Sequence, residues 1–413
     1  MHLLIENAAF RWYWLGRALT SITDSFLFVA LPFAVFQVVG QVDQTALALI
    51  LTLGAVPRFL GLLLGSLIDR LPLRGPFLGS IATRCLSLLG LVGVVWGLQH
   101  RPLLGLWLLG ALVVINGLST VMTTTATGAL IPALVDADDL PRANSLTQAT
   151  MNAVPIGSYV LAGLLIHRFG SAVALWCAAL ALLGSLLTGS RIRFPLREVR
   201  SQGTFLQDVI GGARLVVMTW SLLSVMLVAL LINGLVALLN VLIPLSMSVN
   251  GAGAPGYGVF EACLSSGLLL GIVSAGLLPK GWPLPARMVL ALSVGVAAFL
   301  GFALARDGSP VWLWAGAVTF GWCAGMATIV IITVLQSAAQ VSERGRVFGM
   351  FETLNAVGMI VAPVATSAVS QLSGPATAYA GGGLLLLLAG VTFWVTRGHM
   401  HRPETEGLTA ELT

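Results

Sequence analysis

Twelve long apolar stretches run through this chain of 413 residues, and nearly all basic residues avoid every second loop between them. A helix needs about 20 apolar residues to cross the hydrocarbon core of a bilayer. With 57% hydrophobic and 9% charged residues, the composition lies far from that of soluble globular proteins. The sequence therefore predicts an all-α membrane protein whose twelve transmembrane helices cover residues 12–38, 46–67, 76–98, 103–125, 145–166, 172–190, 216–248, 258–278, 287–305, 311–335, 348–371 and 377–396.

The distribution of Lys and Arg predicts the orientation of these helices. An even number of spans places both termini on the same side of the membrane. If that side is the cytoplasm, only Arg101, Arg168 and Arg306 fall in outward loops, and the other 18 of 21 basic residues (21 − 3) do not. This asymmetry follows the positive-inside rule. We therefore expect cytoplasmic termini, and the net charge of +5 indicates topology and gives no reason to expect nucleic-acid binding.

The longest inward connection divides the chain near its middle. We expect a first six-helix half over 1–190, a cytoplasmic linker over 191–215, a second half over 216–396 and a cytoplasmic tail over 397–413. A weak repeat supports the division, because Thr150-Met-Asn-Ala-Val154 recurs as Thr353-Leu-Asn-Ala-Val357. Duplicated six-helix units are typical of secondary transporters, whose substrate site lies between the halves near the midplane.

Glycines are abundant, at 47 of 413 residues, and suit membrane helices that pack closely. Gly61 with Gly65, and Gly267 with Gly271, form small-residue faces four residues apart. Plain helix packing explains most of them, although sliding interfaces need the same residues. The four cysteines lie far apart in separate spans, so their spacing predicts neither a disulfide nor a metal site.

One loop carries a recognisable motif. Between the second and third spans the chain reads Gly65-Ser-Leu-Ile-Asp69-Arg70-Leu-Pro-Leu-Arg74. This resembles the signature loop of the major facilitator superfamily. The resemblance implies that Asp69 faces the start of the eleventh span, which follows Arg346, where the helix dipole favours a carboxylate. Gly65, Asp69, Arg70, Arg74 and Arg346 would then form the inner gate.

Other segments resemble the drug:proton antiporter branch of that superfamily, which includes macrolide and enterobactin exporters. They are Asn7-Ala-Ala-Phe10-Arg11-Trp-Tyr-Trp14-Leu-Gly16 followed by Asp24, Ala129-Leu-Ile-Pro132-Ala-Leu-Val135, Leu140-Pro-Arg142-Ala-Asn144-Ser-Leu146, Arg84, and Glu343-Arg-Gly-Arg346-Val-Phe348. The resemblance covers essentially the whole chain. It implies transport by alternating access and leaves the substrate open.

Ionisable residues inside the predicted spans are costly in a membrane, so each is a candidate functional residue. Asp24 lies in the middle of the first span and is the leading candidate for proton coupling and substrate binding. The alternative is a fixed salt bridge, for which Arg58 at similar depth is the expected partner. Both apply together if protonation of Asp24 releases Arg58. No His lies in a span, so a proton relay must use carboxylates.

Three further ionisable residues leave alternatives open. Glu352 is either a proton carrier or part of the inner gate. Glu261 is either a proton carrier or a hydrated carboxylate at the outer rim. Arg84, near the start of the third span, is expected to extend toward the membrane interface in a structural role.

Uncharged side chains complete the predicted cavity. Amides and hydroxyls in hydrocarbon need partners, so each is either a ligand group or an interhelical hydrogen bond. Aromatic rings would offer an apolar surface to a substrate. The candidates are Phe28, Asn116, Asn233, Asn240, Trp322 and Thr328.

These observations predict a monomeric exporter in a bacterial cytoplasmic (inner) membrane. It would exchange protons for an amphipathic drug or secondary metabolite, with no cofactor beyond the proton gradient and with the lipid bilayer around it. The alternative is export of an anionic metabolite, such as a siderophore or a lysolipid, with Arg58 or Arg17 as counter-ion. A membrane enzyme is disfavoured because no span holds His or a paired-Asp motif. A non-transporting receptor or scaffold would show no loss of flux when Asp24 is changed.

Overall fold

The computed structural model describes residues 4, 6–60, 72, 74–136, 138–192, 194, 219–279, 281–305, 310–338 and 344–396. Within these ranges the side chains of residues 128–129, 310, 338, 344–346 and 396 are not described. Twelve α-helices make up the regular structure of the described residues: α2 (Ala8–Val39), α3 (Gln44–Phe59), α5 (Arg74–Gly97), α6 (Pro102–Leu134), α7 (Leu140–Phe169), α8 (Ser171–Ser190), α10 (Trp220–Val249), α11 (Gly253–Leu277), α12 (Leu284–Leu304), α13 (Pro310–Ala338), α14 (Arg344–Ser373) and α15 (Pro375–Thr396).

The all-helical membrane fold predicted from the sequence is confirmed. Eleven of the helices in the described ranges are long and apolar enough to cross a membrane, and Gln44–Phe59 is a shorter apolar helix. The second span was expected to reach residue 67, but α3 ends at Phe59, and residues 61–67 lie outside the described part. The predicted linker and tail also lie largely outside it, so their boundaries stay predictions.

Helix α6 extends nine residues beyond the predicted span, which ended at residue 125. A run of threonines made the sequence look less apolar there. Inside the helix, the hydroxyls of Thr123, Thr124 and Thr125 each donate a hydrogen bond to the backbone carbonyl four residues earlier, on Ser119, Thr120 and Val121. Such bonds satisfy a hydroxyl without interrupting the helix.

Capping hydrogen bonds satisfy backbone groups at both ends of α2. The Asn7 side chain accepts a hydrogen bond from the Phe10 amide, which is the usual role of an N-cap amide. The same side chain donates to the carbonyl oxygen of Leu134 and so ties the start of α2 to the end of α6. Gly40 ends the helix in the left-handed conformation, which glycine adopts without steric cost.

The two six-helix halves repeat one packing scheme. In the first half, α3 packs on α6, α5 on α6 and α8, and α2 on α7. In the second half, the corresponding pairs are α11 with α13, α12 with α13 and α15, and α10 with α14. The main contacts between the halves are α3 with α14 and α7 with α11. Because α3 corresponds to α11 and α7 corresponds to α14, each of these contacts is the counterpart of the other. This is the arrangement expected of a duplicated transporter fold.

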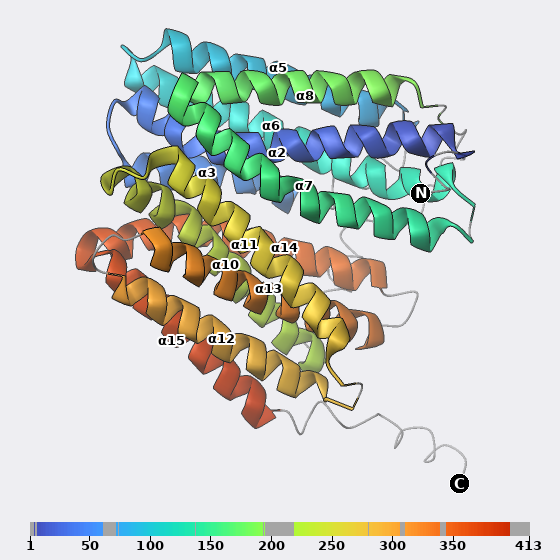
Figure 1. Ribbon diagram of the computed structural model, residues 1–413, viewed down its shortest axis with the longest axis vertical. Coiled ribbons are helices and arrows are strands. Elements are labelled where there is room, and N and C mark those ends of the chain that lie inside the picture. Colours follow the sequence, from blue (N-terminus) through green and yellow to red (C-terminus); the bar gives the residue numbers. More distant parts are fainter. Residues whose placement is uncertain are drawn as a thin grey trace.

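The halves approach each other at one end and separate at the other. In Figure 1, α7 and α11 meet at the left and diverge toward the right, where the marked N- and C-terminal ends lie. We call the right-hand end the termini side and the left-hand end the far side. On the far side, Gln371 donates a hydrogen bond to Thr45 and joins α14 to α3.

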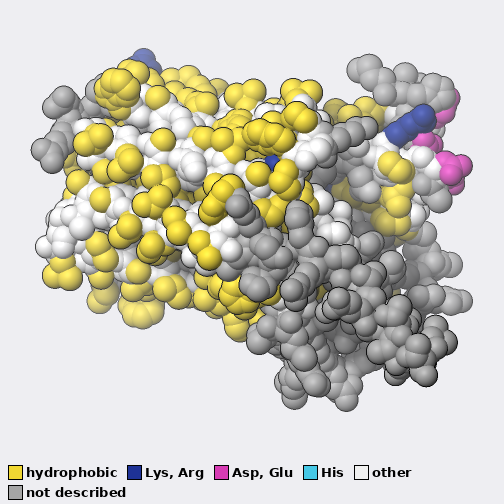
Figure 2. Space-filling view, turned by 90° about the horizontal axis from the view of Figure 1, so that it is seen from below, with side chains coloured by type: hydrophobic (Ala, Val, Ile, Leu, Met, Phe, Trp, Pro, Cys, Tyr) yellow, Lys and Arg dark blue, Asp and Glu magenta, His cyan; other side chains and the backbone are white. Residues whose placement is uncertain are grey.

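The outer surface is suited to lipid. Large apolar side chains project outward from helices of both halves, among them Leu103, Trp107, Leu180, Leu372 and Val395. On the face seen in Figure 2, hydrophobic side chains are spread over the whole described surface, and most of the visible charged side chains gather near the right-hand end. Such a surface is expected where helices contact hydrocarbon and charges stay at the interface.

Candidate functional site

Asp24 and Arg84 form an ion pair in the first half of the molecule. Arg84 Nη2 donates a hydrogen bond to Asp24 Oδ1. Asp24 lies near the middle of α2, and Arg84 lies on the buried face of α5 together with Ser80 and Ser87. The Arg84 side chain is only 1% exposed, whereas that of Asp24 is 45% exposed. The pair therefore combines a buried cation with a carboxylate that remains accessible.

Two predictions about this pair were wrong. Arg58 was the expected partner of Asp24, and Arg84 was expected to extend to the membrane interface. The buried face of α5 instead directs Arg84 into the bundle, where Asp24 supplies the counter-charge that a buried guanidinium needs. Arg58 still lies within electrostatic reach of Asp24, so the two are neighbours without being a pair.

Asp24 faces the space between the halves. Phe28 follows it by one helical turn and so lies on the same face of α2. The Phe28 ring stacks on Tyr257 of α11, with centroids 6.5 Å apart, and lies 6.0 Å from the ring of Tyr159 on α7. Because Phe28 contacts the second half, the accessible carboxylate of Asp24 one turn away points toward the same interface. Phe28 was predicted to offer an aromatic surface to a substrate, and its ring lies at this interface.

Thr20 and Ser21, about one turn before Asp24 on α2, are buried in the first half. The Thr20 hydroxyl bonds the Ser185 hydroxyl of α8 at 3.0 Å. These hydroxyls hold α2 against α8, and they fix the rotation that presents Asp24 to the interface.

A second group of charges lies between α3 and α14. Arg58, near the end of α3, contacts the Met359 sulfur of α14, and Thr52 one and a half turns earlier donates a hydrogen bond to the Ile360 carbonyl at 3.2 Å. Glu352 lies nearly two turns before Met359 on α14, is exposed, and interacts electrostatically with Arg58. The α3–α14 interface therefore carries one cation and one carboxylate that both remain accessible.

The halves are sealed on the far side by close contact between α7 and α11. A Cβ atom added at Gly258 would lie 2.4 Å from the Tyr159 carbonyl oxygen, and one added at Gly163 would lie 2.5 Å from that of Ala254. Real Cβ atoms do not approach that closely, so only glycine allows these backbones to touch. Phe33 extends the seal, with its ring 6.2 Å from that of Tyr257. We call these six residues the far-side seal. No motif or spacing in the sequence marks these residues as a group.

Glu261 is buried beside this seal, one turn after Tyr257 on α11. Its side chain is 3% exposed, and its Oε1 atom has no hydrogen-bond partner among the described residues. The carboxyl group interacts with Tyr257 and, across the interface, with Tyr159. The alternative that Glu261 is hydrated at the rim is therefore wrong, because the close approach of α7 excludes water from it.

The uncharged polar candidates differ in what they contact. Two of the amides hold helices together: Asn116 donates to Ser87 at 3.1 Å between α6 and α5, and Asn233 donates to Asn355 at 3.2 Å between α10 and α14. The Thr328 hydroxyl bonds its own helix at Ala324. Asn240 is buried with an Oδ1 atom that lacks a partner among the described residues. These contacts favour packing roles for Asn116 and Asn233.

Trp322 and the predicted glycine face lie together between α11 and α13. Added Cβ atoms at Gly267 and Gly271 would lie 2.2 Å from the Val318 carbonyl oxygen and 2.3 Å from that of Trp322. The expectation that these glycines serve close helix packing is confirmed. Because both helices belong to the second half, this contact holds that half together and does not join it to the first. Gly61 lies outside the described residues.

The signature loop can be followed only in part. Gly65, Asp69 and Arg70 lie outside the described residues, and so does the side chain of Arg346, although its backbone belongs to α14. Arg74 begins α5 and is exposed. The inner gate therefore stays a prediction. Among the described residues, no three His, Cys, Asp or Glu side chains gather as metal ligands.

The fold and this site define a class of protein. Two similar six-helix bundles, sealed at one end and with accessible charges between them, are the arrangement of a membrane transporter that works by alternating access. Comparison with known families agrees: the sequence profile of the Major Facilitator Superfamily matches residues 13–339 and 284–411. The chain belongs to this superfamily, and it is a transporter and not an enzyme.

Individual relatives refine the comparison. The chain is 27% identical to the enterobactin exporter EntS of Salmonella typhimurium, over 97% of this chain and 95% of that one. It is 25% identical to EntS of Escherichia coli O1:K1, over 95% and 92%. Among solved structures, it is similar to a mutant of the nucleoside transporter NupG (TM-score 0.78, 12% identity, 94% and 99% covered) and to a bacterial homologue of the iron transporter ferroportin in an inward-facing state (TM-score 0.76, 15% identity, 93% and 98% covered). The structural likeness concerns the fold alone.

Proposed function

We propose that this transporter exports amphipathic small molecules from a bacterial cytoplasm by proton antiport, as a monomer with both termini in the cytoplasm. The observation that carries the proposal is the pairing of Asp24, an accessible carboxylate that faces the space between the halves, with Arg84, a guanidinium buried in the first half. A carboxylate at this place can accept a proton or bind a cationic group. Such intramembrane charges mark ion and substrate pathways in transporters.

With cytoplasmic termini, the far side is the periplasmic side, so this conformation is open to the cytoplasm. The far-side seal and the divergence of α7 and α11 support that assignment. Substrate enters from the termini side and reaches Asp24. After the halves rock to the opposite conformation, a proton from outside binds Asp24, weakens its attraction for Arg84 and displaces the substrate.

Glu261 and Glu352 are the further proton-coupling candidates, with different roles. The burial of Glu261 in the far-side seal links its protonation to opening of that seal. Glu352, exposed beside Arg58, is better suited to charge pairing on the termini side. The energy source in this proposal is the proton gradient, with no cofactor.

A second candidate substrate class is an anionic metabolite such as a catecholate siderophore. The relatives named as enterobactin exporters favour it, and so does the exposed Arg58 guanidinium between α3 and α14. An anion would pair with Arg58, whereas a cation would pair with Asp24.

The test is substrate-induced proton movement in proteoliposomes, with macrolides, cationic dyes and catecholate siderophores as substrates. We expect proton flux with at least one class in the wild type and none in Asp24→Asn. Asp43→Asn is the matched control, because Asp43 caps α3 on the far side and Asn caps equally well. Because Asp24→Asn leaves Arg84 buried without a charge partner, the double variant Asp24→Asn with Arg84→Gln is measured beside it. If both variants show proton-coupled flux at the wild-type level, Asp24 is not the proton-coupling residue.

The two substrate classes are separated by Arg58→Ala, with Arg168→Ala, an exposed far-side arginine, as control. Loss of siderophore transport in Arg58→Ala alone identifies an anion exporter. Retained transport of a cationic dye in the same variant identifies a cation exporter.

A further inference from the structure

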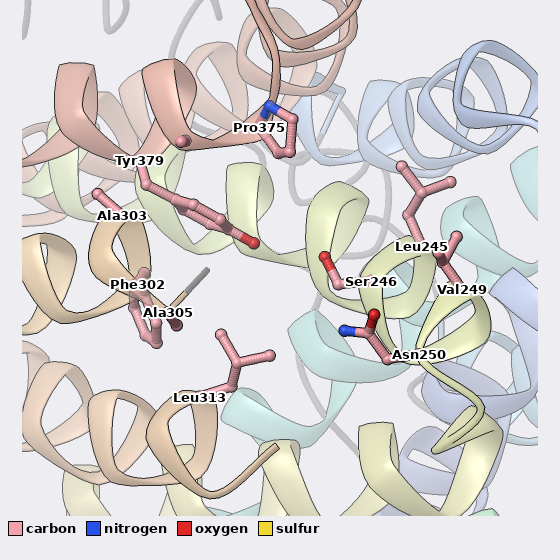
Figure 3. A pocket seen from close by; sticks show the side chains of 11 residues that line it. Leu245, Ser246, Val249, Asn250, Phe302, Ala303, Ala305, Leu313, Pro375 and Tyr379 are labelled. Atoms are coloured by element: carbon pink, nitrogen blue, oxygen red, sulfur yellow. The ribbon is translucent and has the colours of Figure 1, made fainter. Parts of the chain in front are cut away.

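A pocket of about 300 Å³ lies at the far side of the second half, away from the site between the halves. It is lined by the last turn of α10, the end of α12, the first turns of α13 and the start of α15. Figure 3 shows Phe302 and Leu313 on one side of it and Ser246 with Asn250 on another. Its volume is at the lower limit of small-molecule sites.

Tyr379 supplies a buried polar group to this pocket. The residue is only 4% exposed, and its hydroxyl makes no hydrogen bond within the described part of the chain. Figure 3 shows the hydroxyl directed across the pocket toward Ser246, which interacts with it without closing a hydrogen bond. Buried tyrosine hydroxyls usually find a partner, because leaving one unpaired costs the whole desolvation of the group. The pocket therefore offers an unused donor and acceptor to an occupant.

The remaining lining determines what kind of occupant fits. None of the eleven lining residues is Asp, Glu, Lys, Arg or His. A charged group placed here would lose its hydration without gaining a counter-ion. The walls beside Tyr379 are apolar, with Leu245, Val249 and Phe302 among them. A neutral molecule with an apolar body and one oxygen able to form hydrogen bonds matches this lining.

We propose that the pocket is a binding site for a neutral amphiphile, an alkyl or aryl body that carries one hydroxyl or ester oxygen. The oxygen bonds to Tyr379 and Ser246, and the body packs on Phe302 and Leu313. Two sources share this chemistry: the glycerol-ester region of a membrane lipid, and a free alcohol or phenol. The site is independent of the transport proposal, since it lies wholly within the second half.

The site also has a structural consequence. In the described residues, α10 packs extensively on α14 and much less on α15. An occupant that contacts Ser246 on α10 and Tyr379 on α15 bridges these two helices. We therefore expect occupation to raise the thermal stability of the protein.

The experiment is photolabelling of the full-length protein in lipid nanodiscs with a diazirine-bearing octanol, followed by mass spectrometry of the labelled peptides. We expect label concentrated on residues 245–250 and 375–379, and competition by unlabelled octan-1-ol. Tyr379→Phe should weaken binding roughly fivefold, the effect of one hydrogen bond. Tyr13→Phe is the matched control, because Tyr13 is also buried with a hydroxyl that lacks a partner among the described residues, but lies in the first half.

A second variant, Ala303→Trp, fills the pocket and should abolish the label there. If that variant does not fold, Ser246→Ala takes its place and should give a loss similar to that of Tyr379→Phe. Repeating the labelling in detergent with added diacyl lipid separates the two sources: competition by the lipid indicates a membrane lipid, and competition by octan-1-ol alone indicates a free amphiphile. Label spread evenly over lipid-facing helices, or unchanged in Tyr379→Phe and Ala303→Trp, overturns the proposal.

Discussion

Asp24 and Glu261 are carboxylates on opposite halves of the molecule, and both interact with Tyr159. Their surroundings are opposite. Asp24 has a buried arginine partner and an accessible side chain, whereas Glu261 is enclosed beside the far-side seal with one oxygen unpaired among the described residues. An accessible, paired carboxylate can carry its charge in this conformation, whereas burial without a counter-ion favours the neutral form of an enclosed one. The first is therefore suited to bind substrate or a proton, and the second to sense whether the far side is closed.

The largest effect is expected from removing the carboxylate of the ion pair. Asp24→Ala leaves Arg84 charged, buried and without its counter-ion, which costs about 3–5 kcal/mol of unfolding free energy. Arg84→Met preserves the volume and leaves Asp24 with access to water, so it should cost clearly less. Thermal unfolding of the purified variants measures both. Equal losses would mean that Asp24 does not stabilise Arg84.

The second-largest effect is expected from disturbing the far-side seal, which encloses Glu261. Gly258→Val places a side chain against the Tyr159 carbonyl and should disfavour the closed far side by roughly 1–3 kcal/mol, the cost of overpacking. Spin labels at positions 168 and 249, in a cysteine-free background, should report a longer distance between the far ends of the two halves. Gly276→Val on the same helix is the control, because an added Cβ there meets nothing within 4 Å. An unchanged distance in Gly258→Val would show that the seal does not depend on this glycine.

Glu261→Gln sharpens the comparison between the carboxylates. Since the enclosed carboxyl group is stable as the neutral acid, the closed far side binds a proton that the open far side can release to water. Raising the pH should therefore favour far-side opening in the wild type. Gln is neutral at every pH, so the variant should lose this part of the pH response, as measured with the same spin labels. Asp24→Asn should retain it, and an unaltered response in Glu261→Gln would assign the pH dependence elsewhere.

The sequence was sufficient for the fold because the length and apolar composition of each span are local properties. Twelve such apolar stretches are enough to predict a twelve-helix membrane protein. Ion-pair partners are different, because the Asp24–Arg84 contact depends on how α2 and α5 are rotated about their axes. The spacing of Ser80, Arg84 and Ser87 on one face of a helix was the available signal, since small polar neighbours mark a buried face.

The far-side seal was beyond sequence reasoning for a similar reason. Gly163 and Gly258 stand among 47 glycines, and neither has a glycine four residues away to form the pattern sought. Their importance comes from the facing backbone, which belongs to the other half. By contrast, Gly267 and Gly271 could be predicted, because close packing between helices of one half requires a regular small-residue face.

The smallest effects are expected at the interhelical amides, Asn116 and Asn233, which lie on opposite halves. Hydrogen bonds between membrane helices contribute about 0.6 kcal/mol on average, because the separated helices also find partners. Asn116→Ala and Asn233→Ala should therefore lower thermal stability slightly and leave the substrate concentration for half-maximal transport unchanged. Asn240→Ala is measured beside these two variants. The Asn240 Oδ1 atom has no hydrogen-bond partner among the described residues, so this substitution breaks no interhelical bond of that atom. A change of more than about fivefold in apparent affinity, equivalent to one ordinary hydrogen bond, would assign the altered amide to the substrate. If that amide were Asn116 or Asn233, its bond to Ser87 or Asn355 would have to open during the transport cycle.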